Sequence, residues 1–228
     1  MVVVVASHIE PPLGCAVGEA PGQFLVLLQE IARRIVRGVD EAYKVVQNAR
    51  QDDVPVKHQH AVLHLPERLV TEAEYQSCKA EAERLKAHPG DGRGNWNARV
   101  VARYERLATD PQPTHPTPVN VLRIGEAVIC TNQFELYTDF GVQMKARSKA
   151  VQTFVVQLAN GAAAPHPPAD APEDDTNDWL YASSGTYLPS ERAVKGGGYG
   201  AVIQSNVVGP EGGQMLVEET VQMINAMW

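Results

Sequence analysis

Apolar residues are spaced along the chain in the patterns of amphipathic helices and half-buried strands. From Phe24 to Asn48 they recur every three or four positions, which predicts a long helix with one buried stripe. The stripe consists of Ile31, Ile35, Val39, Ala42 and Val46. Apolar and polar residues alternate from Ala61 to Leu65, which predicts a strand ending at Pro66. The apolar run at residues 2–6 predicts another strand, because it is too short for a signal peptide or a membrane span.

Two shorter helices and a proline-rich segment are expected next. Thr71-Glu72-Ala73-Glu74 is a capping box, in which the Glu74 side chain reaches back to the Thr71 amide, so a helix begins here and ends before Pro89. A third helix is expected from about Trp96 to Leu107. Residues 111–118 are expected to form an irregular connector, because the repeated prolines do not suit a regular element.

Strands alternate with helices in the second half of the chain. Residues 119–124 and 127–131 predict a hairpin with a tight turn at Gly125-Glu126, and the apolar run 153–158 predicts a central strand. One helix is expected to carry Phe134, Tyr137, Phe140 and Met144 on one face, and a final helix spans residues 212–227. This alternation predicts an α/β fold in which a mixed sheet is layered with helices.

The predicted elements divide the chain into two segments. Residues 1–110 form a helix-rich segment with one or two strands, and residues 111–228 form an α/β segment. An insertion at about residues 162–178 interrupts the second segment. It carries repeated prolines and acidic residues and no Lys or Arg, so it is expected to be a disordered surface loop.

Composition narrows the classes of function. The formal net charge is -7, and no basic stripe is present, which disfavours a nucleic-acid partner. The three cysteines lie far apart and are odd in number, so a disulfide framework is not expected. Aromatic residues make up only 6% of the chain, which predicts a core built mainly of Val, Leu, Ile and Ala.

Three histidines form a first candidate site. His58, His60 and His64 are separated by even numbers of residues, so their side chains point to one face of an extended strand. Such a face is a candidate metal site. The alternative is a solvent-facing row opposite the apolar residues of the same strand, because no Asp, Glu or Cys within the run completes a closed site.

The glycine-rich run at residues 196–200 lacks the spacing and the Lys-Ser or Lys-Thr pair of a phosphate-binding loop. It predicts a tight turn or a close approach of the backbone to another group. Ser183 and Ser184 precede Gly185, but the Gly-x-Ser-x-Gly pattern of a nucleophile elbow is absent.

Glu135 is a stronger candidate, because it follows an apolar strand and Thr131-Asn132 at the expected start of a helix. Loops that follow parallel strands commonly carry functional side chains. A carboxylate in the first turn of a helix also complements the helix dipole, which is sufficient to explain its presence. The sequence leaves both interpretations open.

Short sequence blocks occur in a fixed order at residues 65–75, 121–126, 131–136, 145–148, 152–160, 186–201 and 208–213. As a set they resemble the neutral/alkaline non-lysosomal ceramidases and their shorter bacterial relatives. Each block is weak by itself, but the ordered set is specific and extends over most of the chain from about Glu30 to Trp228.

The resemblance implies a zinc-dependent amidase that cleaves the N-acyl bond of ceramide or of a related amide through a serine nucleophile. In that family two histidines from the amino-terminal half, a Glu and a Tyr hold the zinc. Glu135 matches the glutamate, Tyr187 is the first choice for the tyrosine, and Tyr199 is the second. Carboxylate and phenolate oxygens are both suitable ligands, although Tyr is uncommon.

The sequence departs from the family pattern in two places. The paired-histidine motif and the Gly-Asp-containing nucleophile block are expected before Glu30, and neither is present. Residues 2–11 faintly resemble the strand that precedes the histidine pair, with Glu10 at the second histidine position. In addition, residues 161–185 separate two blocks that are close together in the family. No catalytic residue is therefore assigned, and the chain is expected to be one incomplete domain.

The leading hypothesis is a fragment of a ceramidase-like zinc amidohydrolase of sphingolipid metabolism that is inactive alone and binds zinc weakly through Glu135 and Tyr187. Its substrate class would be ceramide-like or other N-acyl amides. The alternative is a non-catalytic globular or partner-binding module derived from such an enzyme, which self-associates or pairs with an amino-terminal half. A third hypothesis is an incomplete gene product without a function. No transmembrane segment is expected. The compartment stays open, because family members are often secreted or membrane-associated.

Overall fold

The computed structural model describes residues 21–49, 51–88, 92–159 and 187–228. The chain divides into two units, Met1–Val54 and Pro55–Trp228, and each is described by itself. The expected strand at residues 2–6 and the expected insertion at 162–178 lie outside the described residues.

Helix α1 (Pro21–Val46) is the element described in the first unit. The predicted helix is therefore present, but the prediction of a buried stripe is wrong: Ile31, Val39 and Val46 are exposed, and Ile35 is 62% exposed. The stripe lies open because no other described element of this unit packs against it. An ion pair between Arg34 and Glu30, at 2.9 Å, lies on the exposed surface of the helix.

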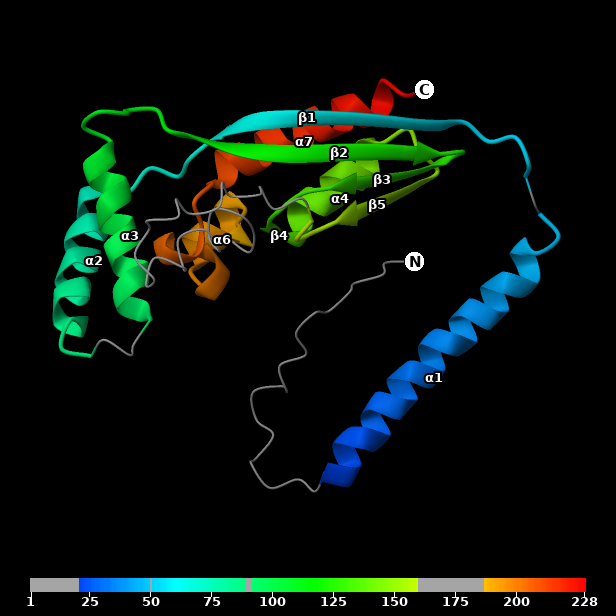
Figure 1. The fold of residues 1–228 in the computed structure, drawn as a ribbon, viewed down its shortest axis with the longest axis horizontal. Coiled ribbons are helices and arrows are strands. Elements are labelled where there is room, and N and C mark those ends of the chain that lie inside the picture. The colour runs from blue at the N-terminus through cyan, green and yellow to red at the C-terminus, as the bar shows by residue number, and fades with distance from the viewer. Residues whose placement is uncertain (1–20, 50, 89–91, 160–186) are drawn as a thin grey trace, which may run out of the picture. The chain divides into compact units, whose positions relative to one another are not determined.

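A four-stranded mixed sheet forms the centre of the second unit (Figure 1). Strand β1 (Val56–Pro66) pairs with β2 (Thr114–Ile124) along its whole length, and β3 (Ala127–Thr131) continues the antiparallel pairing. Strand β5 (Gln152–Val156) then joins β3 in parallel, so the strand order is β1-β2-β3-β5. The predicted α/β fold with a mixed sheet and helices is confirmed, although β5 lies at the edge of this sheet and not at its centre.

Two helices, α4 (Thr138–Arg147) and α7 (Pro210–Asn225), pack on one face of the sheet. The core between them and the strands contains Leu65, Val119, Val128, Phe140, Met144, Leu216 and Ile224. The two helices approach closely at Gly213, where a Cβ atom would stand 2.4 Å from Phe140 Cζ. A glycine at this position is therefore required by packing.

Helices α2 (Glu72–Leu85) and α3 (Arg93–Arg106) pack against each other beside the sheet. The capping box is confirmed: the Thr71 backbone N–H donates to Glu74 Oε2 at 2.9 Å, and the Glu74 N–H donates to Thr71 Oγ1 at 3.3 Å. A second, smaller core joins this helix pair to the later part of the chain. It consists of Val70, Tyr75, Cys78, Val100 and Ile203.

The prediction of an irregular connector at residues 111–118 is wrong over most of that range, because β2 already begins at Thr114. Pro116 and Pro118 pair with His64 and Val62 of β1, whereas β3 reaches only residues 120–124 of β2. The first half of β2 thus has a strand neighbour on one side only. Two prolines spaced two residues apart lack their N–H groups on the same side of the strand, so the unpaired side tolerates both. The predicted β2–β3 hairpin is confirmed, with Gly125 at a φ of 59°.

Candidate functional site

Glu135 lies in a second, two-stranded sheet that the sequence did not predict. Strand β4 (Glu135–Leu136) pairs in parallel with β6 (Tyr187–Leu188). The prediction that Glu135 begins a helix is wrong, because α4 starts at Thr138. The Gln157 side chain holds the β4 backbone extended: its Oε1 accepts from the Leu136 N–H at 3.0 Å, and its Nε2 donates to the Leu136 carbonyl at 3.2 Å.

The structure brings Glu135 and Tyr187 together as direct neighbours across the β4–β6 ladder. Both side chains are partly buried and are joined by a hydrogen bond. Burial, followed by this bond and the nearby carboxylate charge, raises the pKa of Tyr187 to about 12. At neutral pH Tyr187 is therefore a neutral phenol that donates its proton to the Glu135 carboxylate.

Parallel pairing explains why these two residues meet. Strands β3 and β5 run in parallel, and β4 and β6 each follow one of them along the chain. The segment after β5 also folds back onto the segment after β3, since the Ala159 N–H donates to the Asn132 carbonyl at 2.9 Å. Leu158 lies between the end of β5 and Ala159 in the sequence. It has a φ of 53°, a left-handed conformation that is unfavourable for leucine.

Further tyrosines surround the pair. The ring of Tyr199 meets the ring of Tyr187 edge-on with centroids 5.7 Å apart, and Trp96 lies 6.3 Å beyond it. Gly200 presses against Tyr187 and Tyr137, so that a Cβ atom there would stand 2.8 Å from Tyr187 Cδ1. The expected tight turn and close approach of the glycine run are confirmed, because Gly197 and Gly198 have positive φ values.

Two arginines and an asparagine anchor the segment that carries Tyr199, and sequence reasoning missed all three. Asn206 donates to the Val202 carbonyl at 2.8 Å and the Gly200 carbonyl at 3.3 Å. Arg68 donates to the Ala201 carbonyl at 2.8 Å, and Arg103 donates to the Asn206 carbonyl at 3.0 Å. Burial lowers the pKa of Arg103 to about 10. The bonds from the arginines span more than 100 residues in sequence, so no local pattern indicates them.

His115 is a partly buried histidine that sequence reasoning also missed, because it lies inside the proline-rich segment. Its Nε2 lies 2.6 Å from Gln133 Nε2, and its ring packs against Phe134. Burial lowers the pKa of His115, which favours the neutral imidazole. The side chain belongs to the wall of the core near the end of β3 and not to the Glu135 and Tyr187 pair.

The structure places His58, His60 and His64 on one exposed face of β1, whereas Glu135 and Tyr187 lie in β4 and β6. His58 Nε2 lies 3.0 Å from Asn120 Oδ1. Within the described part of the chain, no three His, Cys, Asp or Glu side chains are grouped to hold a metal ion. The two oxygens of Glu135 and Tyr187 are the adjacent donors that could contribute to such a site.

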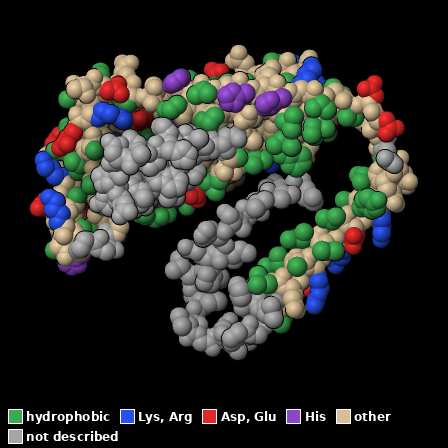
Figure 2. All heavy atoms as spheres, in the orientation of Figure 1, with side chains coloured by type: hydrophobic (Ala, Val, Ile, Leu, Met, Phe, Trp, Pro, Cys, Tyr) green, Lys and Arg blue, Asp and Glu red, His purple; other side chains and the backbone are tan. Residues whose placement is uncertain are grey.

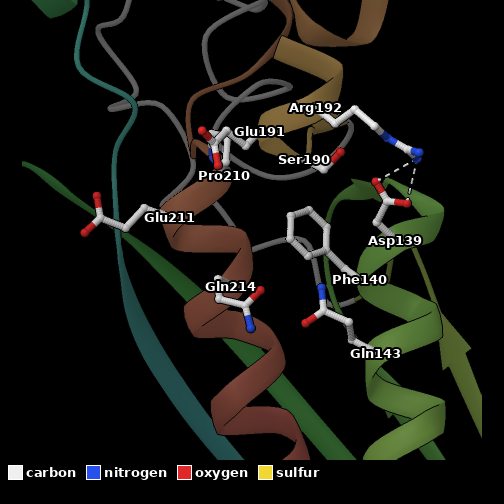
Figure 3. Close-up of a pocket in the computed structure, with 9 residues that line it drawn as sticks. All are labelled: Asp139, Phe140, Gln143, Ser190, Glu191, Arg192, Pro210, Glu211 and Gln214. Atoms are coloured by element: carbon white, nitrogen blue, oxygen red, sulfur yellow. Dashed lines mark hydrogen bonds and ion pairs between the residues drawn. The ribbon is translucent and has the colours of Figure 1, made fainter. Parts of the chain in front are cut away.

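A cavity of about 710 Å³ lies between the first turns of α4, α6 (Glu191–Gly196) and α7 (Figure 3). Arg192 and Asp139 form an ion pair at 3.0 Å at its side, and Gln143 and Gln214 add amide groups. Its carboxylates stand in the first turns of their helices, where they complement the helix dipoles. Neither Glu135 nor Tyr187 is among the lining residues, so this cavity is separate from the tyrosine cluster.

Comparisons with known proteins were made for the whole chain. No protein-family model, curated protein or solved structure matches it. Among the helices that the structure describes, none combines the length and the apolar character needed to cross a membrane.

Proposed function

We propose that this chain is part of a zinc-dependent amidohydrolase that resembles the neutral ceramidases, with Glu135 and Tyr187 as two zinc ligands. The observation that carries the proposal is the direct pairing of these two side chains, which come from segments about 50 residues apart. The resemblance selects the same two residues from sequence blocks alone. Their position after the parallel strands β3 and β5 suits a functional site.

The donor chemistry fits zinc in part. A carboxylate and a phenolate supply two oxygen ligands, whereas stable zinc sites use three or four protein ligands. The described residues include no group of three His, Cys, Asp or Glu side chains that could complete such a site, so binding by the chain alone is expected to be weak. Zinc bound here would polarise an amide carbonyl as a Lewis acid. To coordinate zinc, Tyr187 must lose the phenol proton that it donates to the Glu135 carboxylate in the metal-free chain.

The substrate class that accompanies this proposal is ceramide-like lipids or other N-acyl amides. Acyl transfer of this kind needs an activated nucleophile, and no serine or cysteine beside the Glu135 and Tyr187 pair is assigned that role. The purified chain is therefore expected not to hydrolyse a fluorogenic ceramide, with or without added zinc. Zinc-dependent turnover that follows the chain through purification would contradict this expectation.

Calorimetric titration with zinc tests the ligand assignment. The chain is expected to bind one zinc ion weakly and to release a proton, measured in buffers of different ionisation enthalpy. Glu135→Gln should abolish binding, and Tyr187→Phe should abolish both binding and proton release. Glu191→Gln is the matched control, because its carboxylate is exposed and pairs with Lys195. Equal binding by the chain and by Glu135→Gln would exclude the site.

The second candidate is a non-catalytic module that binds a protein partner or its own copy. The observation that favours it is the sheet face opposite α4 and α7, which carries exposed apolar side chains such as Val56 and Val62. A chain of this kind would keep Glu135 and Tyr187 as a structural hydrogen bond. It should retain its fold in excess chelator and show no response to zinc in the titration above.

A further inference from the structure

Helices of the second unit pack on one face of the four-stranded sheet, and the other face carries exposed apolar side chains. One face packs against α4 and α7. The opposite face, called the open face here, carries Val56, Val62, Leu122, Ile124, Ile129 and Phe154. Strand pairing places these residues side by side, since Val56 faces Ile124, Leu122 faces Ile129, and Ile129 faces Phe154. Val56 is 66% exposed and Val62 is 49% exposed.

Figure 2 shows this open face toward the viewer, with histidine side chains along it and a hydrophobic patch beside them. The positions of β1, β2, β3 and β5 on this face include no Asp, Glu, Lys or Arg, in a chain with 21% charged residues. A sheet face directed at water normally carries polar and charged side chains. An uncharged apolar patch of this kind marks a protein contact surface.

We infer that the open face binds the open face of a second copy of this chain. Strands spaced about 4.8 Å apart with a rise of about 3.3 Å per residue give the face a plan area of roughly 500 Å². Two such faces bury about 1,000 Å², which reaches the lower limit of a specific interface. Because neither face carries Asp, Glu, Lys or Arg, two copies meet without repulsion between such side chains.

Face-to-face packing also has a suitable geometry. Two sheets stack about 10 Å apart with their strands nearly aligned, and their inner side chains interdigitate. A twofold axis between identical faces gives an isologous contact, which closes at the dimer. The helices α4 and α7 then lie on the outer sides of the pair, so the assembly is a four-layer sandwich with both sheets inside.

Sedimentation equilibrium of the full chain over a range of concentrations tests this inference. The chain is expected to be dimeric at high concentration and to dissociate on dilution, as befits a small interface. Substitution of two exposed residues, Val62→Glu with Ile124→Glu, should raise the dissociation constant at least about tenfold, because unpaired carboxylates are costly to bury. Circular dichroism should show an unchanged fold, since both side chains already face water.

Val142→Glu is the matched control, because Val142 is exposed on α4, which packs on the other face of the sheet. This variant should dimerise like the unchanged chain. A dimer that survives Val62→Glu with Ile124→Glu, or a chain that is monomeric at all concentrations, would overturn the inference. Protection of an Ile124→Cys thiol from maleimide in a monomer would also overturn it, because some other group would then cover the face.

Discussion

Around Tyr187 the distances between atoms leave no room for an added methyl group. A Cβ atom at Gly200 would stand 2.8 Å from Tyr187 Cδ1 and 2.9 Å from Tyr137 Oη. Gly200→Ala is therefore expected to lower the free energy of unfolding by about 1–3 kcal/mol, as overpacking does. Gly141→Ala is the control: an added Cβ atom there would meet no side chain or distant backbone within 4 Å, so this substitution in α4 should stabilise by about 0.5–1 kcal/mol. Urea unfolding measures both, and equal effects would contradict the packing argument.

Among the residues that the structure describes, Leu158 is the one non-glycine residue with a left-handed backbone conformation. That conformation costs a leucine about 1–2 kcal/mol, whereas asparagine tolerates it through local hydrogen bonds. Leu158→Asn is therefore expected to raise the free energy of unfolding by about 0.5–1 kcal/mol, because the side chain is already exposed. Leu69→Asn, at an exposed position with negative φ, should give no gain. Thermal unfolding of the two variants measures these effects. A lower free energy of unfolding for Leu158→Asn would show that the leucine side chain makes stabilising contacts and would contradict the prediction.

At the scale of single elements, the sequence correctly predicted those features that depend on residues close together in the chain. The capping box at Thr71 and the hairpin turn at Gly125 form as expected, because the residues involved satisfy their own backbone groups. The final helix also forms, with Leu216 and Ile224 on its buried side. The resemblance drew Glu135 and Tyr187 from separate blocks, and the structure places them side by side.

Other elements depend on partners that are distant in sequence, and these were not predictable. Pro116 and Pro118 suggested a connector, but one-sided pairing with β1 keeps them in a strand. Glu135 looked like a helix start, but the bridge from Gln157 keeps β4 extended. The stripe of α1 has helical spacing, yet spacing does not reveal whether a partner surface is present.

Arg103 of α3 shows how one side chain fixes a distant element. Its guanidinium donates to the carbonyls of Arg68 at 2.7 Å and Asn206 at 3.0 Å, and the side chain is partly buried. Arg103→Lys keeps the positive charge but loses the planar guanidinium, whose N–H groups donate to several carbonyls at once. The free energy of unfolding should therefore fall by about 2–3 kcal/mol. Hydrogen exchange should rise first at residues 199–207. Arg84→Lys, at an exposed pair with Glu81, should change stability by less than about 0.5 kcal/mol. Equal losses in the two variants would argue against anchoring by Arg103.

At the scale of the whole molecule, the second unit has two separate cores. The larger joins the sheet to α4 and α7, and the smaller joins α2 and α3 to Ile203. Each contains one buried free cysteine, Cys130 in the larger core and Cys78 in the smaller. Apolar burial scales with stability, so the smaller core is expected to open at a lower free energy than the larger.

The two thiols report that order of opening. Burial raises the pKa of both, to about 12 for Cys130, so neither is a reactive thiolate in the folded chain at pH 8. In a Cys15→Ser variant, increasing urea should expose Cys78 to a maleimide before Cys130, as identified by peptide mass spectrometry. The neutral thiol stabilises the fold below its ordinary pKa near 8.5, and that stabilisation is lost as the pH rises toward 12. Both labelling midpoints should therefore move to lower urea between pH 8 and pH 10. Simultaneous labelling of the two cysteines at every urea concentration would mean that the two cores unfold as one.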